Sequence, residues 1–494
     1  MSQPHVVVVG SGNAALCAGI SALESGARVT MLEKADQAEA GGNSRYTAGA
    51  MRFAYDSGED VLPLLRRRDD ERLASTEFGA YPTSKFEADM LAFNGGEPLN
   101  PLQQYLIDES CATLRWLTTH NVRFDPIYSR QTFEKNGRLV FWGGLTLESA
   151  GEGAGLVDAE LAEFTRLGGL IRYGADCRGL VKREGIVAGV EVDGGAGRET
   201  VECDAVVLGC GGFEASAAMR QRFMGERWVR AKVRGTRHNT GDGLMMALDA
   251  GAAIEGQPDG CHAVPVDRHM PDYANLSLPF IERKNYRKIC YFLGVMLNAA
   301  GERFVDEGEN FRNYTYAQFG RAILQQPGSF AWQVFDSTVD ALLYDEYRFE
   351  HASFVEADSL QALVHKLGDV DAEQALGTIK KFNAAVDESR AFDPTVLDGR
   401  CTRGLTLAKT NWANRIDTPP FRAYPVTCGI TFTYAGVRIN LSGAVLDKDG
   451  RRIPGLFACG EIVGGVFRDG YPGGSGLTSG AVFGRLAGRS AACA

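Results

Sequence analysis

One segment near the N-terminus constrains the fold of this chain more than any other. Residues 5–34 read HVVVVGSGNAALCAGISALESGARVTMLEK, a β-branched run, a GSG turn, an apolar helical stretch and a second strand. Gly10 permits the tight turn, Gly12 lets backbone approach a pyrophosphate, and Ala15 keeps the helix close to the strand. The diphosphate would lie on the helix N-terminus, whose free N–H groups favour anions. Glu33 follows where a carboxylate accepts hydrogen bonds from an adenosine ribose, so the segment predicts a dinucleotide-binding βαβ unit. An ordinary glycine-rich βα turn is the alternative.

A second glycine-rich segment, IPGLFACGEIVGGVFRDGYPGGSGLTSGAVFGRLAG, occupies residues 453–488. Its pattern predicts a strand over 456–459, a glycine-rich turn, and a helix that begins near Gly474 and carries small residues on one face. A helix N-terminus built from GGSG lets a flat, electron-rich group come close. It also favours negative charge, such as that on a reduced flavin ring.

These two segments, with GGNS at 41–44 and TGDG at 240–243, resemble the flavoprotein family of fumarate reductase and succinate dehydrogenase. Within that family, GYPGGSGLTSGAVFGRLAG and GGNSRYTAGAMR are most similar to the tricarballylate dehydrogenase branch, and the resemblance covers nearly the whole chain. It implies an α/β fold, in which a Rossmann-like FAD-binding domain of the glutathione-reductase type carries an inserted α+β capping domain. The implied cofactor is FAD rather than NAD.

The resemblance also implies which residues bind the cofactor. They are Gly10, Gly12, Asn13, Ala14, Ala15, Glu33, Lys34, Gly42, Asn43, Ser44, Gly211, Gly212, Thr240, Asp242, Gly460, Glu461, Gly474, Ser475, Gly476 and Leu477. In relatives of the respiratory complexes, a histidine in the early glycine-rich loop bonds covalently to the flavin. Residues 41–52 contain no histidine, so the FAD is expected to be non-covalent.

The domain organisation follows changes in composition along the chain. Residues 1–256 and 421–494 are expected to form the FAD-binding domain, and 257–420, richer in aromatic residues, the capping domain. Strands are expected between 170 and 208 and over 330–336, and an amphipathic helix over 371–389. The pair Pro419-Pro420 is interpreted as a hinge-like return to the FAD-binding domain.

Composition excludes several classes of function. The chain has 494 residues, 45% hydrophobic and 23% charged, which is typical of a soluble globular protein of two or three lobes. A net charge of −10 argues against nucleic acid as a partner. No apolar run approaches the roughly 20 residues of a membrane span. The first strand begins at residue 5, which leaves no room for a leader peptide, so we expect a cytoplasmic protein.

The 11 cysteines are scattered without a CxxC pair. Iron–sulfur clusters and haem attachment need closely spaced ligands, so we expect neither, and no other metal. A flavin in this chain would therefore pass its electrons to a separate acceptor protein or to a quinone-linked partner.

The reaction of the family moves a hydride between flavin N5 and one carbon of a C–C bond, and a proton at the neighbouring carbon. The segment GERFVDEGENFRNYTYA at 301–317 resembles the capping-domain segment whose arginine is the acid in fumarate reductases, and Arg312 is the matching position. A guanidinium is a poor acid, so it would need a carboxylate relay from Asp306, Glu307 or Glu309. A structural salt bridge is the alternative role for Arg312.

The resemblance also marks a substrate-binding group. His262 occupies the position of the family's substrate-binding histidine, although a buried core histidine is the alternative. Fumarate reductases hold carboxylate with a histidine and an arginine in the segment that corresponds to 466–474. This chain has Phe467 and Tyr471 there, with Arg468 beside the lost histidine, so the C4-dicarboxylate clamp is altered. A tyrosine at this place also occurs in steroid dehydrogenases of the same superfold, where it assists enolisation.

The implied activity is that of an FAD-dependent dehydrogenase that desaturates a C–C bond next to a carboxylate, as in tricarballylate to cis-aconitate. Arg312 or Tyr471 would transfer the proton, and His262, Arg468, Tyr471 and Arg312 would bind a small anionic substrate. The alternatives are an ene-reductase of an unsaturated acid, a ketosteroid-dehydrogenase-like or precorrin-modifying flavoenzyme, and a flavin-binding subunit without activity.

Overall fold

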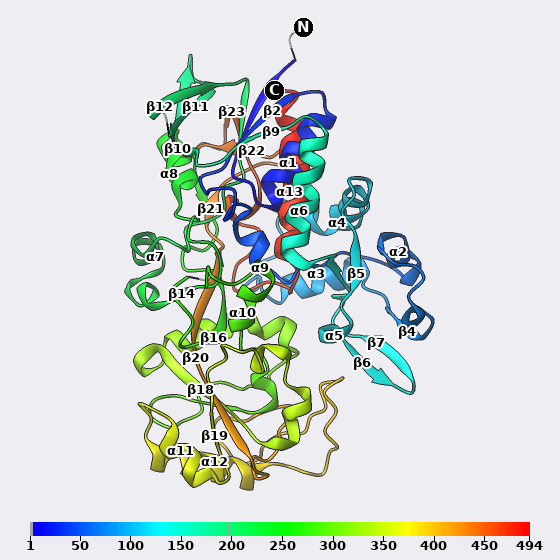
Figure 1. The fold of residues 1–494 in the computed structure, drawn as a ribbon, viewed down its shortest axis with the longest axis vertical. Coiled ribbons are helices and arrows are strands. Elements are labelled where there is room, and N and C mark those ends of the chain that lie inside the picture. The colour runs from blue at the N-terminus through cyan, green and yellow to red at the C-terminus, as the bar shows by residue number, and fades with distance from the viewer. Residues whose placement is uncertain (1–2, 196, 274) are drawn as a thin grey trace. The chain divides into compact units, whose positions relative to one another are not determined.

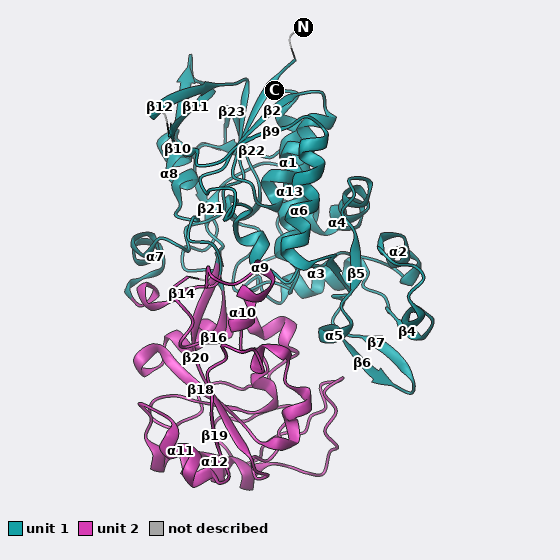
Figure 2. Cartoon of the chain, in the orientation of Figure 1, with its two compact units in different colours: residues 1–226, 235–262, 432–494 teal, residues 227–234, 263–431 magenta. Residues whose placement is uncertain are grey.

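The computed structural model describes residues 3–195, 197–273 and 275–494, and the chain divides into two compact units (Figure 2). Unit 1 comprises 1–226, 235–262 and 432–494, and unit 2 comprises 227–234 and 263–431. Each unit has its own sheet and is described by itself.

The centre of unit 1 is a six-stranded sheet in the order β22-β23-β13-β1-β2-β9. β1 (His5–Val9) pairs in parallel with β2 (Arg28–Leu32) and with β13 (Ala205–Leu208), and β23 (Arg452–Ala458) continues the parallel pairing beyond β13. The valines of β1 are buried on both faces, as expected for a central parallel strand. The edges are β9 (Leu170–Arg172) and the antiparallel β22 (Ala444–Leu446). The expected βαβ unit is therefore present, with α1 (Asn13–Glu24) as its helix.

Three helices of unit 1 pack side by side, as Figure 1 shows: α1, α6 (Glu152–Arg166) and α13 (Ser475–Ala491). Glycines permit the close approach of α13 to α1. A Cβ on Gly484 would lie 2.4 Å from the carbonyl oxygen of Ala14, and one on Gly488 would lie 2.0 Å from that of Ala18. The small residues of the C-terminal segment therefore face the dinucleotide-binding helix.

The remaining elements of unit 1 form small sheets and peripheral helices. Three antiparallel strands, β10 to β12, make the small sheet expected after residue 170. The bounds of these elements are β3 (Ala50–Met51), α2 (Gly58–Val61), β4 (Thr76–Glu77), α3 (Thr83–Leu91), α4 (Pro101–Thr119), β5 (Phe124–Pro126), α5 (Tyr128–Gln131), β6 (Thr132–Lys135), β7 (Arg138–Phe141), β8 (Leu147–Ser149), β10 (Asp176–Arg183), β11 (Ile186–Gly194), β12 (Gly197–Glu202), α7 (Ala217–Met224), α8 (Asp242–Asp249), β15 (Ile254–Glu255) and β21 (Gly436–Val437).

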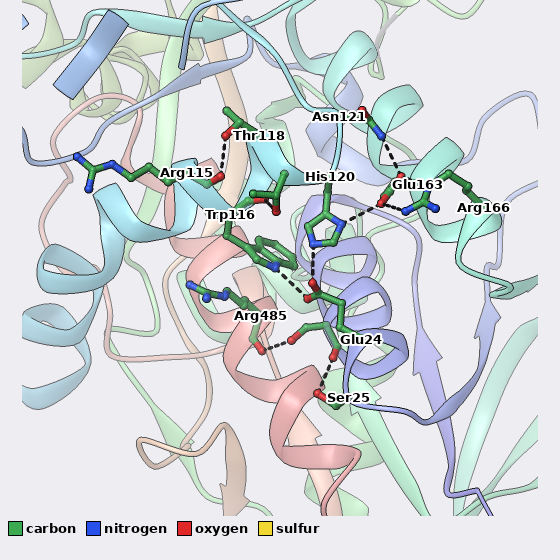
Figure 3. A network of polar contacts seen from close by, with 12 residues as sticks. Glu24, Ser25, Arg115, Trp116, Thr118, His120, Asn121, Glu163, Arg166 and Arg485 are labelled. Atoms are coloured by element: carbon green, nitrogen blue, oxygen red, sulfur yellow. Dashed lines mark hydrogen bonds and ion pairs between the residues drawn. The ribbon is translucent and has the colours of Figure 1, made fainter. Parts of the chain in front are cut away.

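A polar network fastens α4 to α1 and α6 (Figure 3). His120, which follows α4, places Nδ1 2.9 Å from Oε1 of Glu163 and Nε2 2.8 Å from Oε1 of Glu24. Trp116 donates its indole N–H to the other oxygen of Glu24, and Arg166 donates twice to Glu163. The network joins three helices through charged hydrogen bonds, which are stronger than neutral ones.

Unit 2 is built on a sheet in the order β14-β20-β18-β17, to which β16 and β19 add by pairing with β20. Aromatic and aliphatic side chains on both sides of β18 form two hydrophobic clusters. The elements are β14 (Lys232–Val233), β16 (Cys261–Asp267), α9 (Phe280–Arg283), β17 (Val295–Leu297), α10 (Arg312–Leu324), β18 (Phe330–Phe335), β19 (Val355–Ala357), α11 (Leu360–Lys366), α12 (Ala372–Ala385) and β20 (Phe421–Thr433).

The structure refines several expected boundaries. The strand expected over 330–336 is β18, and the helix expected over 371–389 is the shorter α12. The expected return to the FAD-binding domain at 421 differs from the structure, because β20 begins there and belongs to unit 2 as far as Thr431. The other division falls after His262 rather than after residue 256, and 227–234 joins unit 2 because β14 pairs with β20. Across the described residues, no helix is both long and apolar enough to cross a bilayer.

Candidate cofactor and active site

A cavity of about 860 Å³ opens in unit 1 at the carboxyl ends of the parallel strands. This end of an open α/β sheet is where such folds bind their ligands. The predicted cofactor residues that line the cavity are Gly10, Gly12, Ala14, Glu33, Lys34, Gly42, Asn43, Ser44, Gly211, Asp242 and Glu461.

The N-terminus of α1 faces this cavity. Gly12 precedes the helix without a side-chain cap, the first turn has no acidic residue, and the N–H of Asn13 donates to Ser44 Oγ at 3.1 Å. Gly10 has φ +99°, and a Cβ there would lie 2.7 Å from the carbonyl oxygen of Gly209. Glycine is therefore required at this turn, and the free helix terminus can accept a diphosphate.

Glu33 lies at the end of β2 and is only 6% exposed. Its Oε2 accepts from Ser11 Oγ at 2.5 Å, and its Oε1 accepts from the N–H of Ala35 at 2.7 Å. Burial raises the pKa of the carboxyl, whereas these hydrogen bonds oppose the shift. A fixed, buried carboxylate at the cavity wall can accept hydrogen bonds from a ribose, as predicted.

The TGDG turn is held by a lysine from the first βαβ unit. Lys34 Nζ donates to Thr240 Oγ1 and Asp242 Oδ2, each at 2.8 Å, and Thr240 Oγ1 donates to Asp242 at 2.5 Å. Lys34 and Asp242 thus neutralise one another at the cavity. The predicted Thr240 stabilises the turn and is not among the lining residues.

Several lining residues were not expected, among them Ser11, Cys210, Thr236, His238 and Asn239. They lie beside motifs that were recognised, so proximity to the TGDG and GCGG turns was the available signal. His238, which precedes the TGDG turn, lines the cavity, where burial lowers the pKa of its imidazole, helped by Arg237 and Lys34.

The predicted residues at the start of α13 lie close to the start of α1. Asn13 Nδ2 donates to the carbonyl of Leu477 at 2.9 Å. The N-cap Gly474 has φ +89°, and Arg52 donates from Nε to the carbonyl of Gly473 at 2.8 Å. Ser475 Oγ is buried and has no hydrogen-bond partner within the described part of the chain, as expected of a hydroxyl that serves a ligand. The other predicted residues outside the cavity lining are Ala15, Gly212, Gly460 and Gly476.

Unit 1 brings two of the predicted catalytic residues together. Tyr471 Oη lies 3.2 Å from His262 Nδ1, and their ring centroids are 5.0 Å apart. Phe432, Phe467 and Tyr434 join them in one aromatic cluster, in which Phe432 is the half-buried member. We call these five residues the aromatic cluster.

Arg468 takes a different position from its two neighbours in the motif. Phe467 and Tyr471 are buried, but Arg468 is exposed, and its guanidinium lies against Gly95, where a Cβ would be 2.9 Å from Nε. The structure therefore does not bring Arg468 into contact with the His262–Tyr471 pair. Of the predicted substrate-binding groups in unit 1, the aromatic cluster therefore contains His262 and Tyr471 but not Arg468.

Arg312 belongs to unit 2, where it begins α10 and is 7% exposed. Its guanidinium lies over the ring of Tyr344, 5.1 Å from the centroid. Burial opposes the charge of Arg312, but Tyr344, Cys290 and Glu346 outweigh burial and raise its pKa.

Two of the three acids proposed from sequence as a relay for Arg312 have other hydrogen-bond partners. Glu307 is taken by Arg303, which donates to it from Nε at 3.1 Å and from Nη2 at 2.5 Å. Asp306 accepts from the N–H groups of Gly308 and Thr410. The carboxylate that acts on Arg312 is Glu346, which is also bonded to Arg287.

Comparisons with known proteins agree with this geometry. The family model described as FAD binding domain matches residues 5–477. A fumarate reductase (cytochrome) of Shewanella frigidimarina is 27% identical, over 99% of this chain and 78% of that protein. A vinyl phenol reductase of Lactiplantibacillus plantarum is 25% identical, over 99% of this chain and 96% of that protein. The 3-ketosteroid Δ1-dehydrogenase structure from Sterolibacterium denitrificans covers 100% of both chains with a TM-score of 0.75 and 18% identity, which shows a shared fold.

Proposed function

We propose that this protein desaturates a C–C bond next to a carboxylate. The chain belongs to the FAD-binding domain family, and it is an FAD-dependent oxidoreductase acting on CH–CH groups. The observation that carries this proposal is the contact between Tyr471 Oη and His262 Nδ1 inside the aromatic cluster. A phenol and an imidazole in contact can hold one oxygen of a carboxylate or carbonyl group and polarise the carbon beside it.

The cavity of unit 1 would hold the FAD. The N-terminus of α1 would bind the diphosphate, Glu33 the adenosine ribose, and the start of α13 the region of the ring. When bound, FAD supplies the two-electron acceptor of the reaction. The fit rests on the uncapped helix, the buried Glu33 carboxylate and the unpartnered Ser475 hydroxyl. No histidine lies in 41–52, so we propose that the cofactor is held without a covalent bond.

Within the aromatic cluster, Tyr471 is the group we propose to orient the substrate. Its hydroxyl faces the imidazole, so it can donate a hydrogen bond to a substrate oxygen while His262 accepts or donates on its other side. Both side chains are buried, and a hydrogen bond in such a site is stronger than one in water.

Arg312 is the group we propose to exchange the proton with the substrate carbon. Its raised pKa keeps it charged, which suits attraction of a carboxylate and makes proton loss depend on a neighbouring base. Glu346 is the carboxylate that acts on it in unit 2, in place of the acids beside it in sequence.

The class of substrate is the most specific part of the proposal. Tricarballylate is the example that the motif resemblance suggests. The aromatic cluster supports a second candidate, the reduction of an unsaturated compound with an aromatic or apolar body. That candidate is favoured by the four rings clustered with a single imidazole and by similarity to a vinyl phenol reductase. The two differ in substrate and in direction, so one set of measurements separates them.

The test is anaerobic flavin spectroscopy on the purified holoprotein. Saturated carboxylic acids should bleach the oxidised flavin, and their esters and amides should not. Unsaturated acids and vinyl phenols are then mixed with the dithionite-reduced protein, and return of the oxidised spectrum indicates the reducing direction. A neutral ketosteroid that bleaches the flavin faster than every acid would refute the carboxylate proposal.

The proposed roles are tested by single-turnover flavin reduction. Arg312→Lys should slow the step by at least about 10²-fold, because lysine lacks the planar guanidinium, and Tyr471→Phe should slow it by less. Arg321→Lys, on the same helix α10, is the matched control and should stay near the native rate. A greater loss in Tyr471→Phe than in Arg312→Lys would move the proton role to Tyr471.

A further inference from the structure

We propose that Glu214 and Glu461 form a carboxyl pair that shares one proton, and that the protonated Glu461 is a positioning residue for the cofactor cavity of unit 1. This inference rests on the proposed placement of FAD in that cavity. Both residues lie outside the steps assigned to His262, Tyr471 and Arg312.

The first member of the pair is held as a charged group. Glu214 is fully buried, and its Oε1 accepts from Asn43 Nδ2 at 2.6 Å and from Asn239 Nδ2 at 2.7 Å. Two amide donors on one oxygen favour the carboxylate form. Its other oxygen, Oε2, is also buried and receives no such donor from the described residues.

The second member completes the arrangement. Glu461 lines the cavity, and its Oε1 accepts from the N–H of Thr433 at 2.8 Å and from Thr433 Oγ1 at 3.2 Å. Its carboxyl group interacts directly with that of Glu214. Two ionised carboxylates offer only acceptors, so a hydrogen bond between these two carboxyls requires that one of them is protonated.

The backbone is shaped to admit these side chains. A Cβ on Gly212 would lie 2.2 Å from Glu461 Oε1, and a Cβ on Gly211 would lie 2.5 Å from Asn239 Nδ2. A Cβ on Gly235 would lie 2.0 Å from Asn43 Oδ1. Three glycines from two turns thus leave room for the polar groups around the pair.

The electrostatics favour a single proton. Two carboxylates in contact cannot both ionise without a large penalty here, because Glu214 is fully buried and Glu461 is half-buried. Burial raises the pKa of both groups, and the charge of Glu214 adds to the effect on Glu461. The groups that act on the pair are the amides of Asn43 and Asn239, Thr433 and the two carboxyls themselves. Elsewhere on the cavity wall, Lys34 and Asp242 neutralise each other, and Glu33, Glu39, Asp176 and His238 also line the cavity.

The consequence concerns cofactor retention. With one proton the pair carries one negative charge instead of two beside a cavity that must admit a diphosphate. Loss of the proton at alkaline pH should weaken FAD binding, because the second charge repels the anionic cofactor and the contact between the two carboxyls becomes repulsive.

The experiment compares Glu461→Gln, Glu461→Ala and Glu214→Gln with the native chain. Infrared spectra of the apoprotein should contain a protonated-carboxyl component that is lost in both glutamine variants, since each leaves one carboxylate and no shared proton. The buried Glu160, whose pKa is raised well above its ordinary value by burial, gives a separate signal that the variants should leave unchanged. Glu199→Gln, on the exposed strand β12, is the control and should keep the band. The infrared measurement is independent of substrate and of activity, so it is separate from the test of the proposed function.

FAD affinity provides the second readout, followed by fluorescence quenching on titration of apoprotein from neutral to alkaline pH. Glu461→Gln still donates to Glu214, so its affinity at neutral pH should fall by less than about fivefold, and alkaline weakening should be smaller than in the native chain. Glu461→Ala removes the donor to the second oxygen of Glu214, which keeps its bonds from Asn43 and Asn239, and should bind FAD at least about tenfold more weakly. The proposal is overturned if the infrared band persists in both glutamine variants, or if Glu461→Gln loses as much affinity as Glu461→Ala.

Discussion

The contact between α13 and α1 offers a sharp test of how the C-terminal segment supports the cofactor cavity. In Gly484→Ala, the new methyl group would lie 2.4 Å from the carbonyl oxygen of Ala14 and 2.8 Å from Cys17 Cβ. Both neighbours belong to α1, whose N-terminus lines the cavity, so the strain cannot be relieved by moving a flexible side chain.

The expected cost follows from two opposed effects. Forcing extra atoms into a well-packed core costs about 1–3 kcal/mol, and replacing glycine by alanine inside a helix gains about 1 kcal/mol. The approach of 2.4 Å requires the helices to separate, which places the packing cost at the upper end of its range. We therefore expect a net loss of about 1–2 kcal/mol in the free energy of unfolding and weaker FAD binding.

Gly377→Ala is the matched control, because Gly377 lies inside α12 and a Cβ there would meet no atom within 4 Å. This variant should gain about 0.5–1 kcal/mol. Urea denaturation measures both changes, and amide hydrogen exchange in α13 reports on the contact itself. If Gly484→Ala is as stable as the native chain, or if Gly377→Ala loses as much, the steric argument is refuted.

Three further predictions follow from the cofactor site and the polar network. Glu33→Ala should weaken FAD binding by about 1–3 kcal/mol, or roughly 5- to 150-fold, by fluorescence titration; an unchanged affinity would show that Glu33 does not serve the cofactor. The purified protein should be yellow and should release its FAD into the supernatant on acid or heat precipitation, whereas colour that remains in the pellet would contradict non-covalent binding. Arg166, with help from His120 and Asn121, lowers the pKa of Glu163 to about 2. A carboxyl whose pKa is lowered by folding stabilises the native state above its unfolded pKa of about 4.3, and this contribution is lost as the pH falls towards 2. The melting temperature should therefore drop over that window, and Arg166→Gln should show a smaller acid-dependent drop than the native chain.

The sequence predicted the parts of the fold that depend on neighbouring residues. One short segment contains β1, the turn at Gly10 and the start of α1. A run of strand residues, a glycine with positive φ and an uncapped helix follow one another there. The placement of Glu33 at the cavity follows from the length of the same βαβ unit. Such local rules are independent of the rest of the chain, so they could be read without the structure.

The arrangement of groups from distant segments could not be predicted in the same way. The sequence suggested that an acid just before Arg312 is its partner. One of these acids, Glu307, instead forms an ion pair with Arg303, which lies four residues before Glu307. Glu346 reaches Arg312 only through the packing of unit 2. Similarly, His238 faces the cavity because the TGDG turn is fixed by Lys34, a contact between residues remote in sequence.

The composition of the aromatic cluster bears on how many carboxylates the proposed substrate carries. A carboxylate that leaves water must be met by charge or by hydrogen bonds, or its burial costs several kcal/mol. Within the cluster, the His262–Tyr471 pair can meet one such group, and the exposed Arg468 is directed to Gly95. A second or third carboxylate would have to be met by groups outside the cluster or remain in water. We therefore expect an acid with one carboxylate and an apolar body to reduce the flavin with a lower KM than tricarballylate. The reverse order would show that cations outside the cluster dominate recognition.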